Sequence, residues 1–251
     1  MGVAQVLRCV LQCVLQCVLQ CACTRGPVSG YPVLLEGSRV SALIVGGGRV
    51  AHRKAVALLE CGAAVRVVAP EIGDDLRQAA ADWPRLTLIE RSYLATDVRD
   101  AALVIAATNV REVNAAVTTD AMTRGRLVNV ADFPEDGNCV TVAAHSAGPL
   151  VVGVSAGGVP DAASRVRDAI ARRFDARYGA ALATLVALRR ELLDAGDRDG
   201  WYAAKRDLVG DDFCETVERG GFAEDVANWR ADRPHGAADA DGRSVEGAAW
   251  G

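Results

Sequence analysis

Three consecutive glycines, Gly46, Gly47 and Gly48, are the residues whose type and spacing most clearly indicate chemistry in this chain of 251 residues. They follow an apolar run, residues 42–45, and Ala51 completes the spacing Gly-x-Gly-x-x-Ala. This spacing is typical of a strand-to-helix turn that binds the pyrophosphate of a dinucleotide. The glycines permit the turn and the close approach of the phosphates, and the N–H groups at the helix N-terminus favour the anion.

The segments around this turn predict a parallel sheet. A second apolar run, residues 64–69, follows Gly62, which suits a helix C-terminus. Apolar runs at residues 86–90, 100–107 and 127–130 then alternate with segments of helical spacing. We therefore expect an α/β fold with a Rossmann-type doubly wound parallel sheet and right-handed crossovers.

Ligands of such sheets bind at the carboxyl ends of the strands. Besides the glycines, the residues that follow the predicted strands at this edge are Pro70, Glu71, Thr108, Asn109 and Asp132. A carboxylate at a strand end can accept a proton, although Asp132 can also be read as a turn residue before Pro134. The acidic residue that usually binds the adenine ribose would stand at about Ala69, so Glu71 is displaced and can also be read as a solvated acid. No arginine cluster stands there to hold a 2′-phosphate, which favours NAD over NADP.

The pattern changes beyond Gly137. Residues 140–144 and 150–155 predict an antiparallel hairpin with its turn at residues 146–149, and Asp161 is expected to cap a helix that continues to about Tyr178. A further helix over residues 180–193 and several small helices complete a helical C-terminal domain. The expected divisions are residues 1–30, 31–141, 142–173, 174–231 and 232–251, the last being a disordered tail.

The composition indicates an ordinary globular protein. Hydrophobic residues make up 51% of the chain and the formal net charge is −4, which argues against a nucleic-acid-binding protein. No stretch after residue 30 has the length of a membrane span. The cysteines beyond residue 30 are few and scattered, as expected in the reducing cytoplasm, and we expect no resident metal site.

The first 30 residues repeat Val-Leu-Gln-Cys and place four cysteines at intervals of four. One interpretation is a metal-binding helix, because thiolates at this spacing share a face. Another is a secretory signal, which the interrupting glutamines disfavour. The preferred hypothesis is that this is a low-complexity segment, which is either disordered or the result of a start codon placed too early.

Five motifs in this order resemble the precorrin-2 dehydrogenase/sirohydrochlorin ferrochelatase family, which also forms the N-terminal module of sirohaem synthase. The motifs, within residues 31–190, are Val45-Gly46-Gly47-Gly48-x-Val50-Ala51-x-Arg53-Lys54-Ala55, Val67-Val68-Ala69-Pro70, Ala106-Ala107-Thr108, Asn129-Val130-x-Asp132 and Ser155-x-Gly157-Gly158. The resemblance implies NAD-dependent oxidation of precorrin-2 to sirohydrochlorin in sirohaem biosynthesis and, in some members, insertion of ferrous iron. It also implies a homodimer that pairs through residues 142–173, and a helical part that covers the cleft.

The resemblance also implies roles for individual residues. The catalytic base falls on Asp132. The cofactor contacts fall on Gly47, Gly48, Arg49, Val50, Pro70 and Glu71, with Thr108 nearby, and the glycine spacing adds Gly46. Because precorrin-2 is a polycarboxylate, Arg165, Arg172 and Arg173 are candidate substrate ligands, or else a solvated basic face. His145 could reach a metal but suits a polar turn equally. The rival hypothesis from another class is a non-catalytic NAD-sensing regulatory module.

Overall fold

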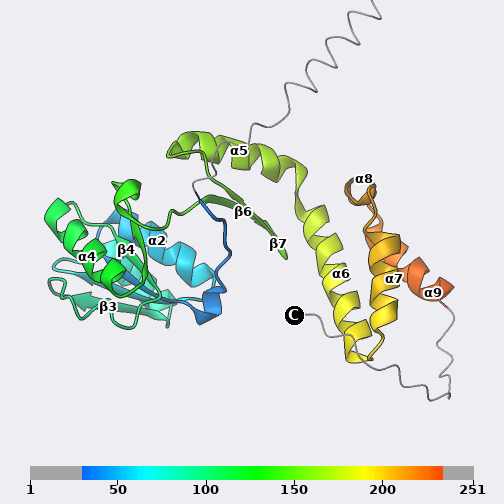
Figure 1. Cartoon of the computed structure of the whole chain (residues 1–251), viewed down its shortest axis with the longest axis horizontal. Helices are drawn as coiled ribbons and strands as arrows, with labels where there is room; N and C mark the ends of the chain where they lie inside the picture. The colour runs from blue at the N-terminus through cyan, green and yellow to red at the C-terminus, as the bar shows by residue number, and fades with distance from the viewer. Residues whose placement is uncertain (1–29, 234–251) are drawn as a thin grey trace, which may run out of the picture. The chain divides into compact units, whose positions relative to one another are not determined.

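The computed structural model describes residues 30–233 (Figure 1), and these residues form two compact units that divide between Asp132 and Phe133. The cysteine repeat and the tail beyond residue 233 lie outside the described residues.

The first unit contains a five-stranded, wholly parallel sheet in the order β3-β2-β1-β4-β5. Its strands are β1 (Ser41–Val45), β2 (Ala64–Ala69), β3 (Leu86–Glu90), β4 (Leu103–Ala106) and β5 (Leu127–Val130). Its helices are η1 (Gly37–Arg39), α2 (Arg49–Glu60), α3 (Asp74–Asp82) and α4 (Arg111–Thr123). This strand order confirms the predicted Rossmann-type doubly wound sheet.

The central strands of this sheet are apolar throughout rather than alternating. All four residues of β4 are buried, as are the last four of β1, which is typical of strands whose two faces are both covered. Helix α2 buries Ala51, Ala55 and Leu59, which recur every four residues and so share one face. Ala51 is fully buried, so the third small position of the fingerprint lies in the core.

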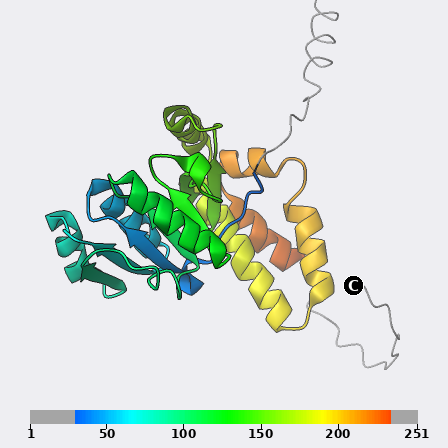
Figure 2. The same ribbon diagram turned by 60° about the vertical axis from the view of Figure 1, so that its left-hand side comes forward.

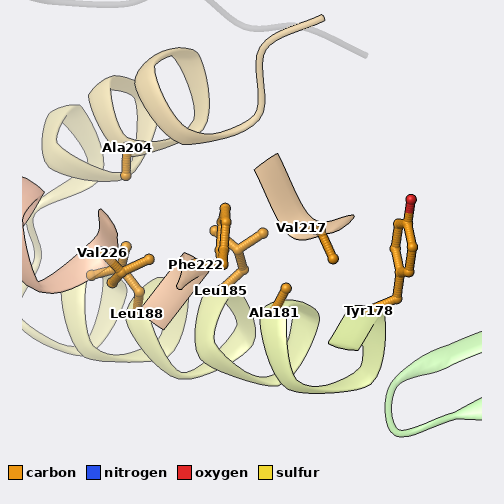
Figure 3. Close-up of a cluster of buried hydrophobic side chains, with 8 residues drawn as sticks. All are labelled: Tyr178, Ala181, Leu185, Leu188, Ala204, Val217, Phe222 and Val226. Carbon is orange, nitrogen blue, oxygen red and sulfur yellow. The ribbon is translucent and has the colours of Figure 1, made fainter. Parts of the chain in front are cut away.

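The second unit contains a hairpin and a set of helices. Its elements are η2 (Pro134–Asp136), β6 (Ala143–Ala147), β7 (Leu150–Val154), α5 (Pro160–Arg173), α6 (Ala176–Asp194), α7 (Arg198–Leu208), α8 (Phe213–Arg219) and α9 (Phe222–Asp232). Helices α7, α8 and α9 all contact α6, and Figure 2 shows them gathered beside this yellow helix. Figure 3 shows the core they enclose, in which Leu185 and Leu188 of α6 meet Phe222 and Val226 of α9.

The predicted first strand of the hairpin is wrong by about three residues, whereas the second strand, β7, agrees with the expected residues 150–155 to within one residue. The first strand is β6, Ala143–Ala147, rather than residues 140–144, and the turn is Gly148-Pro149. Gly148 has a φ of +54°, which only glycine adopts readily, and a Cβ added there would lie 3.2 Å from the Cα of Gly179 on α6. This close packing on α6 fixes the turn at Gly148.

The predicted end of the helix that begins near Asp161 is also wrong. Helix α5 ends at Arg173, and the chain turns at Phe174-Asp175. The side chain of Asp175 then caps α6 by accepting a hydrogen bond from the N–H of Arg177 at 2.9 Å. Asp161 lies in the first turn of α5, and its expected capping position belongs to Val159.

Candidate active site

The glycine turn at the carboxyl end of β1 is packed against its neighbours on two sides. Gly46 has a φ of +129°, and a Cβ there would overlap the backbone carbonyl of Ala107, which follows β4. A Cβ on Gly47 would overlap the carbonyl of Glu71, which follows β2. Backbone hydrogen bonds of 3.0 Å from Gly46 N to Val68 O and 2.9 Å from Gly73 N to Gly47 O hold the turn in place. Neither Gly46 nor Gly47 can therefore carry a side chain without a shift of backbone.

Gly48 differs because the space above it is open. A Cβ built there meets no atom within 4 Å, and its φ of −93° is accessible to any residue. Gly48 is the N-cap of α2, and no side chain caps this helix. The first bond of the helix runs from His52 N to Gly48 O, so the preceding N–H groups, including those of Arg49 and Val50, have no partner within the helix. A free helix N-terminus beneath a glycine with open space fits the pyrophosphate of NAD.

The carboxyl end of β2 carries Pro70 and Glu71, both of which are exposed. Ala69 is buried, so no acidic side chain occupies the usual ribose-binding position. Two arginines near this edge are already paired. Arg77 of α3 contacts Glu90 at 2.7 Å, and Arg91 forms a bidentate pair with Asp97 at 2.6 and 2.8 Å.

The ion pair holds Arg91 against a buried carboxylate. The side chain of Asp97 is 8% exposed, and it also accepts a hydrogen bond from Leu94 N at 2.9 Å. The Arg91 guanidinium holds the pKa of Asp97 below its ordinary value. Arg91 is therefore held in the loop between β3 and β4 by its ion pair with Asp97. A nucleotide 2′-phosphate would have to displace Asp97 to contact this arginine.

Thr108 and Asp132 follow the neighbouring strands β4 and β5, and the side chain of Asn114 on α4 joins them. The Asn114 Nδ2 donates to Thr108 O at 3.0 Å and to Asp132 Oδ1 at 3.3 Å, while its Oδ1 accepts from Thr108 N at 3.2 Å. Asn114 is buried and Asp132 is exposed. The sheet thus places a carboxylate at the same edge as the glycine turn.

Asn114 is not among the site residues predicted from the sequence, although the spacing of residues on α4 contains a signal for it. On α4 the positions 114, 117, 118 and 121 are buried, and three of them carry Val117, Thr118 and Ala121. Asn114 stands on this core-facing stripe, and a buried carboxamide needs hydrogen-bond partners. The pattern predicts that the carboxamide of Asn114 must have hydrogen-bond partners, but only the fold shows which groups these partners are.

The candidate substrate ligands lie on α5, in the second unit. Arg165 and Arg172 are exposed and form no ion pair within residues 30–233. Arg173 differs, because its Nε donates to Glu218 Oε1 at 2.7 Å. The buried Tyr178 donates its hydroxyl to the same oxygen at 2.9 Å, and the two donors, Arg173 first, hold the pKa of Glu218 below its ordinary value.

His145 lies on β6, and its Nε2 is 2.6 Å from the carbonyl oxygen of Phe174. A carbonyl can only accept, so this nitrogen carries the proton and is not available to a metal. In the part of the chain that the structure describes, no group of three or more His, Cys, Asp or Glu residues could hold a metal ion. None of the described helices is both long enough and apolar enough to cross a membrane.

This geometry defines a class of protein: a Rossmann-type dinucleotide-binding unit with a carboxylate at the ligand-binding edge of its sheet. Comparison with known proteins agrees. Residues 33–143 match a protein-family model described as "Putative NAD(P)-binding". This match confirms the dinucleotide-binding domain that the glycine spacing predicts.

Known proteins also resemble the chain over a longer stretch. It is 38% identical over 186 residues to a siroheme synthase of Ectopseudomonas mendocina, covering 73% of this chain and 36% of that protein. It is 37% identical over 199 residues to a siroheme synthase of Chromobacterium violaceum, covering 79% of this chain and 40% of that protein. The chain thus spans about two fifths of the length of these relatives.

The fold also has a counterpart among solved structures. The structure of SirC, a precorrin-2 dehydrogenase, matches with a TM-score of 0.63 and 24% identity, covering 80% of this chain and all of SirC. The matches to siroheme synthases confirm the predicted family resemblance, and the match to SirC confirms the predicted fold.

Proposed function

We propose that this protein oxidises precorrin-2 to sirohydrochlorin with NAD as the hydride acceptor. The observation that carries the proposal is the position of Asp132, whose carboxylate follows β5 at the same sheet edge as the glycine turn that follows β1. The likeness to siroheme synthases and to a precorrin-2 dehydrogenase supports this choice of substrate.

The oxidation removes two electrons and two protons from the substrate, one hydrogen leaving as hydride and the other as a proton. When bound, NAD supplies the hydride acceptor. The N–H groups of Arg49 and Val50 would hold the pyrophosphate, and Pro70, Glu71 and Thr108 would contact the rest of the cofactor. Asp132 accepts the proton, and its exposure lets it pass the proton on to water.

The preference for NAD over NADP is part of the proposal. A 2′-phosphate needs a cationic partner, and the arginines near the carboxyl ends of β2 and β3, Arg77 and Arg91, are paired with Glu90 and Asp97. Glu71 adds an exposed negative charge beside β2. Repulsion from Glu71 disfavours the additional phosphate, and Arg77 and Arg91 are not available to offset this repulsion.

The substrate carboxylates are proposed to bind arginines of α5. Arg165 and Arg172 are available, whereas Arg173 must exchange Glu218 for a substrate carboxylate. Guanidinium groups suit this role because they bind carboxylates through two parallel hydrogen bonds. Arg165 and Arg172 are therefore expected to contribute more than Arg173.

A homodimer in the cytoplasm completes the proposal. Within the described residues β6 and β7 pair only with each other, so each has one edge without a neighbouring strand. Val151 is 44% exposed on this hairpin. An edge strand can pair with that of a second copy, and Val151→Lys should therefore yield monomers in light-scattering measurements. A dimer that persists in this variant would argue against pairing through the hairpin.

The deciding experiment mixes the purified full chain with precorrin-2 and NAD and records the absorbance of NADH and sirohydrochlorin. Both products should appear in equal amounts. Asp132→Asn should bind NAD normally and turn over about 10²–10⁴-fold more slowly, whereas Glu135→Gln, an exposed neighbour, should match the parent. NAD binding without turnover would favour a regulatory module, and turnover by Asp132→Asn within a fewfold of the parent would remove Asp132 from the mechanism. Adding ferrous iron afterwards tests whether sirohaem also forms.

A further inference from the structure

The carboxamide of Asn114 lies between the ends of two neighbouring strands. Its side chain comes from the first half of α4 and is 3% exposed. It contacts Thr108, two residues after β4, and Asp132, two residues after β5. One buried amide therefore connects the end of β4 to the end of β5, where the proposed base Asp132 lies.

The orientation of this amide is fixed by the backbone of Thr108. A backbone N–H can only donate and a carbonyl can only accept. The Asn114 Oδ1 must therefore face Thr108 N, at 3.2 Å, and the Nδ2 must face Thr108 O, at 3.0 Å. The second N–H of Nδ2 is left for Asp132 Oδ1, at 3.3 Å. Asn114 presents a donor to Asp132 by necessity.

Asn114 is also the only hydrogen-bond partner of the Asp132 carboxylate within residues 30–233. An exposed aspartate without a partner samples several rotamers, and each departure from the reactive position lowers the rate. A donor on Oδ1 restricts these rotamers and leaves Oδ2 open to a proton from the substrate. The backbone of Thr108, in turn, keeps the donor itself in place.

We propose that Asn114 is a positioning residue for Asp132: its amide orients the carboxylate for proton abstraction and touches neither substrate nor cofactor. This inference rests on the proposed function, because it concerns the same proton transfer. It assigns to Asn114 an effect on turnover that passes through Asp132, and no separate effect on the affinity for NAD.

The first test is Asn114→Asp, which keeps the size and the acceptor toward Thr108 N but replaces Nδ2, the donor to both Thr108 O and Asp132, by an acceptor. We expect kcat to fall about 10- to 100-fold, while the Kd for NAD and the KM for precorrin-2 stay within about threefold. Thr118→Val is the matched control, because Thr118 is also buried on α4 and its hydroxyl donates a hydrogen bond to the backbone carbonyl of Asn114 at 2.8 Å, not to its side chain. Its kcat should stay within about twofold of the parent.

A double-mutant cycle separates positioning from a general structural effect. If Asn114 acts through Asp132, then Asn114→Asp should cost less than about twofold in kcat when Asp132 is already Asn. An equal loss in both backgrounds would overturn the proposal. So would a kcat of Asn114→Asp within twofold of the parent, or a fall in NAD affinity as large as the fall in kcat.

A measurement without substrate or cofactor keeps the inference independent of activity, and it serves equally if Asn114→Asp does not fold. The side-chain amide of Asn114 gives its own NMR signals, and Asp132→Ala should shift them, since it removes the acceptor, whereas Glu135→Gln should not. Unchanged signals in Asp132→Ala would refute the contact. Shifted signals in a protein that fails to oxidise precorrin-2 would support the contact and contradict the proposed function alone.

Discussion

Gly48→Asp separates cofactor binding from folding. Gly48 has an extended backbone, and a side chain there meets no protein atom within 4 Å. Aspartate is among the best N-cap residues, so the variant should fold with a free energy of unfolding within about 1 kcal/mol of the parent. We therefore expect the substitution to lower the affinity for NAD and to leave folding intact.

The loss of NAD affinity follows from two effects. A side chain at Gly48 blocks the approach of the pyrophosphate to the N–H groups of α2, and each charge-assisted hydrogen bond is worth about 1.5–3 kcal/mol. A carboxylate about 4 Å from a phosphate adds repulsion of about 4 kcal/mol at an effective dielectric constant near 20. Losing one such bond together with part of this repulsion should weaken binding at least about 10²-fold.

Calorimetric titration of NAD measures this loss, and urea unfolding checks the fold. Gly48→Ser is the control that separates volume from charge: it caps the helix equally well but should lose less affinity than Gly48→Asp. Near-normal NAD affinity in a folded Gly48→Asp protein would remove the glycine turn from the site.

Three further predictions concern stability and substrate binding. Gly47→Ala should lower the free energy of unfolding by about 1–3 kcal/mol in urea titrations, because its Cβ would overlap the carbonyl of Glu71; an unchanged midpoint would contradict this packing. The folded-state pKa of Asp97 is depressed by Arg91, so its contribution to stability is present at neutral pH and lost as the pH falls below about 4. Asp97→Asn should therefore be less stable at pH 7 and show a flatter decline in acid, and a decline as steep as the parent's would refute the linkage. Arg172→Ala should raise the KM for precorrin-2 about tenfold with an unchanged Kd for NAD, and an unchanged KM would leave this arginine as surface charge.

The sequence by itself determined the first unit nearly to the residue. The bounds of β2, β3 and β5 agree with the expected runs at residues 64–69, 86–90 and 127–130, whereas β4 is shorter than the expected run at residues 100–107. These strands are short, mostly apolar runs with glycine, proline or charged residues close to their ends, so their limits are visible locally. The glycine turn is equally local, because its steric demands fall on consecutive residues.

The second unit was harder to predict because its decisive contacts are not local. The hairpin strands alternate between half-buried and exposed residues, so their register depends on the packing of Gly148 against Gly179. Asp175 resembles an ordinary acidic residue inside a long helix until the chain turns there and its side chain caps α6.

Only the tertiary structure decided how the polar groups are paired. Asn114 reaches Asp132 because parallel strands end at one edge of the sheet, and Arg173 meets Glu218 because α8 packs on α6. A hydrogen bond between residues 18 or 45 positions apart leaves no periodic trace in the sequence. Residue types show which groups can react, whereas the fold determines which of them meet.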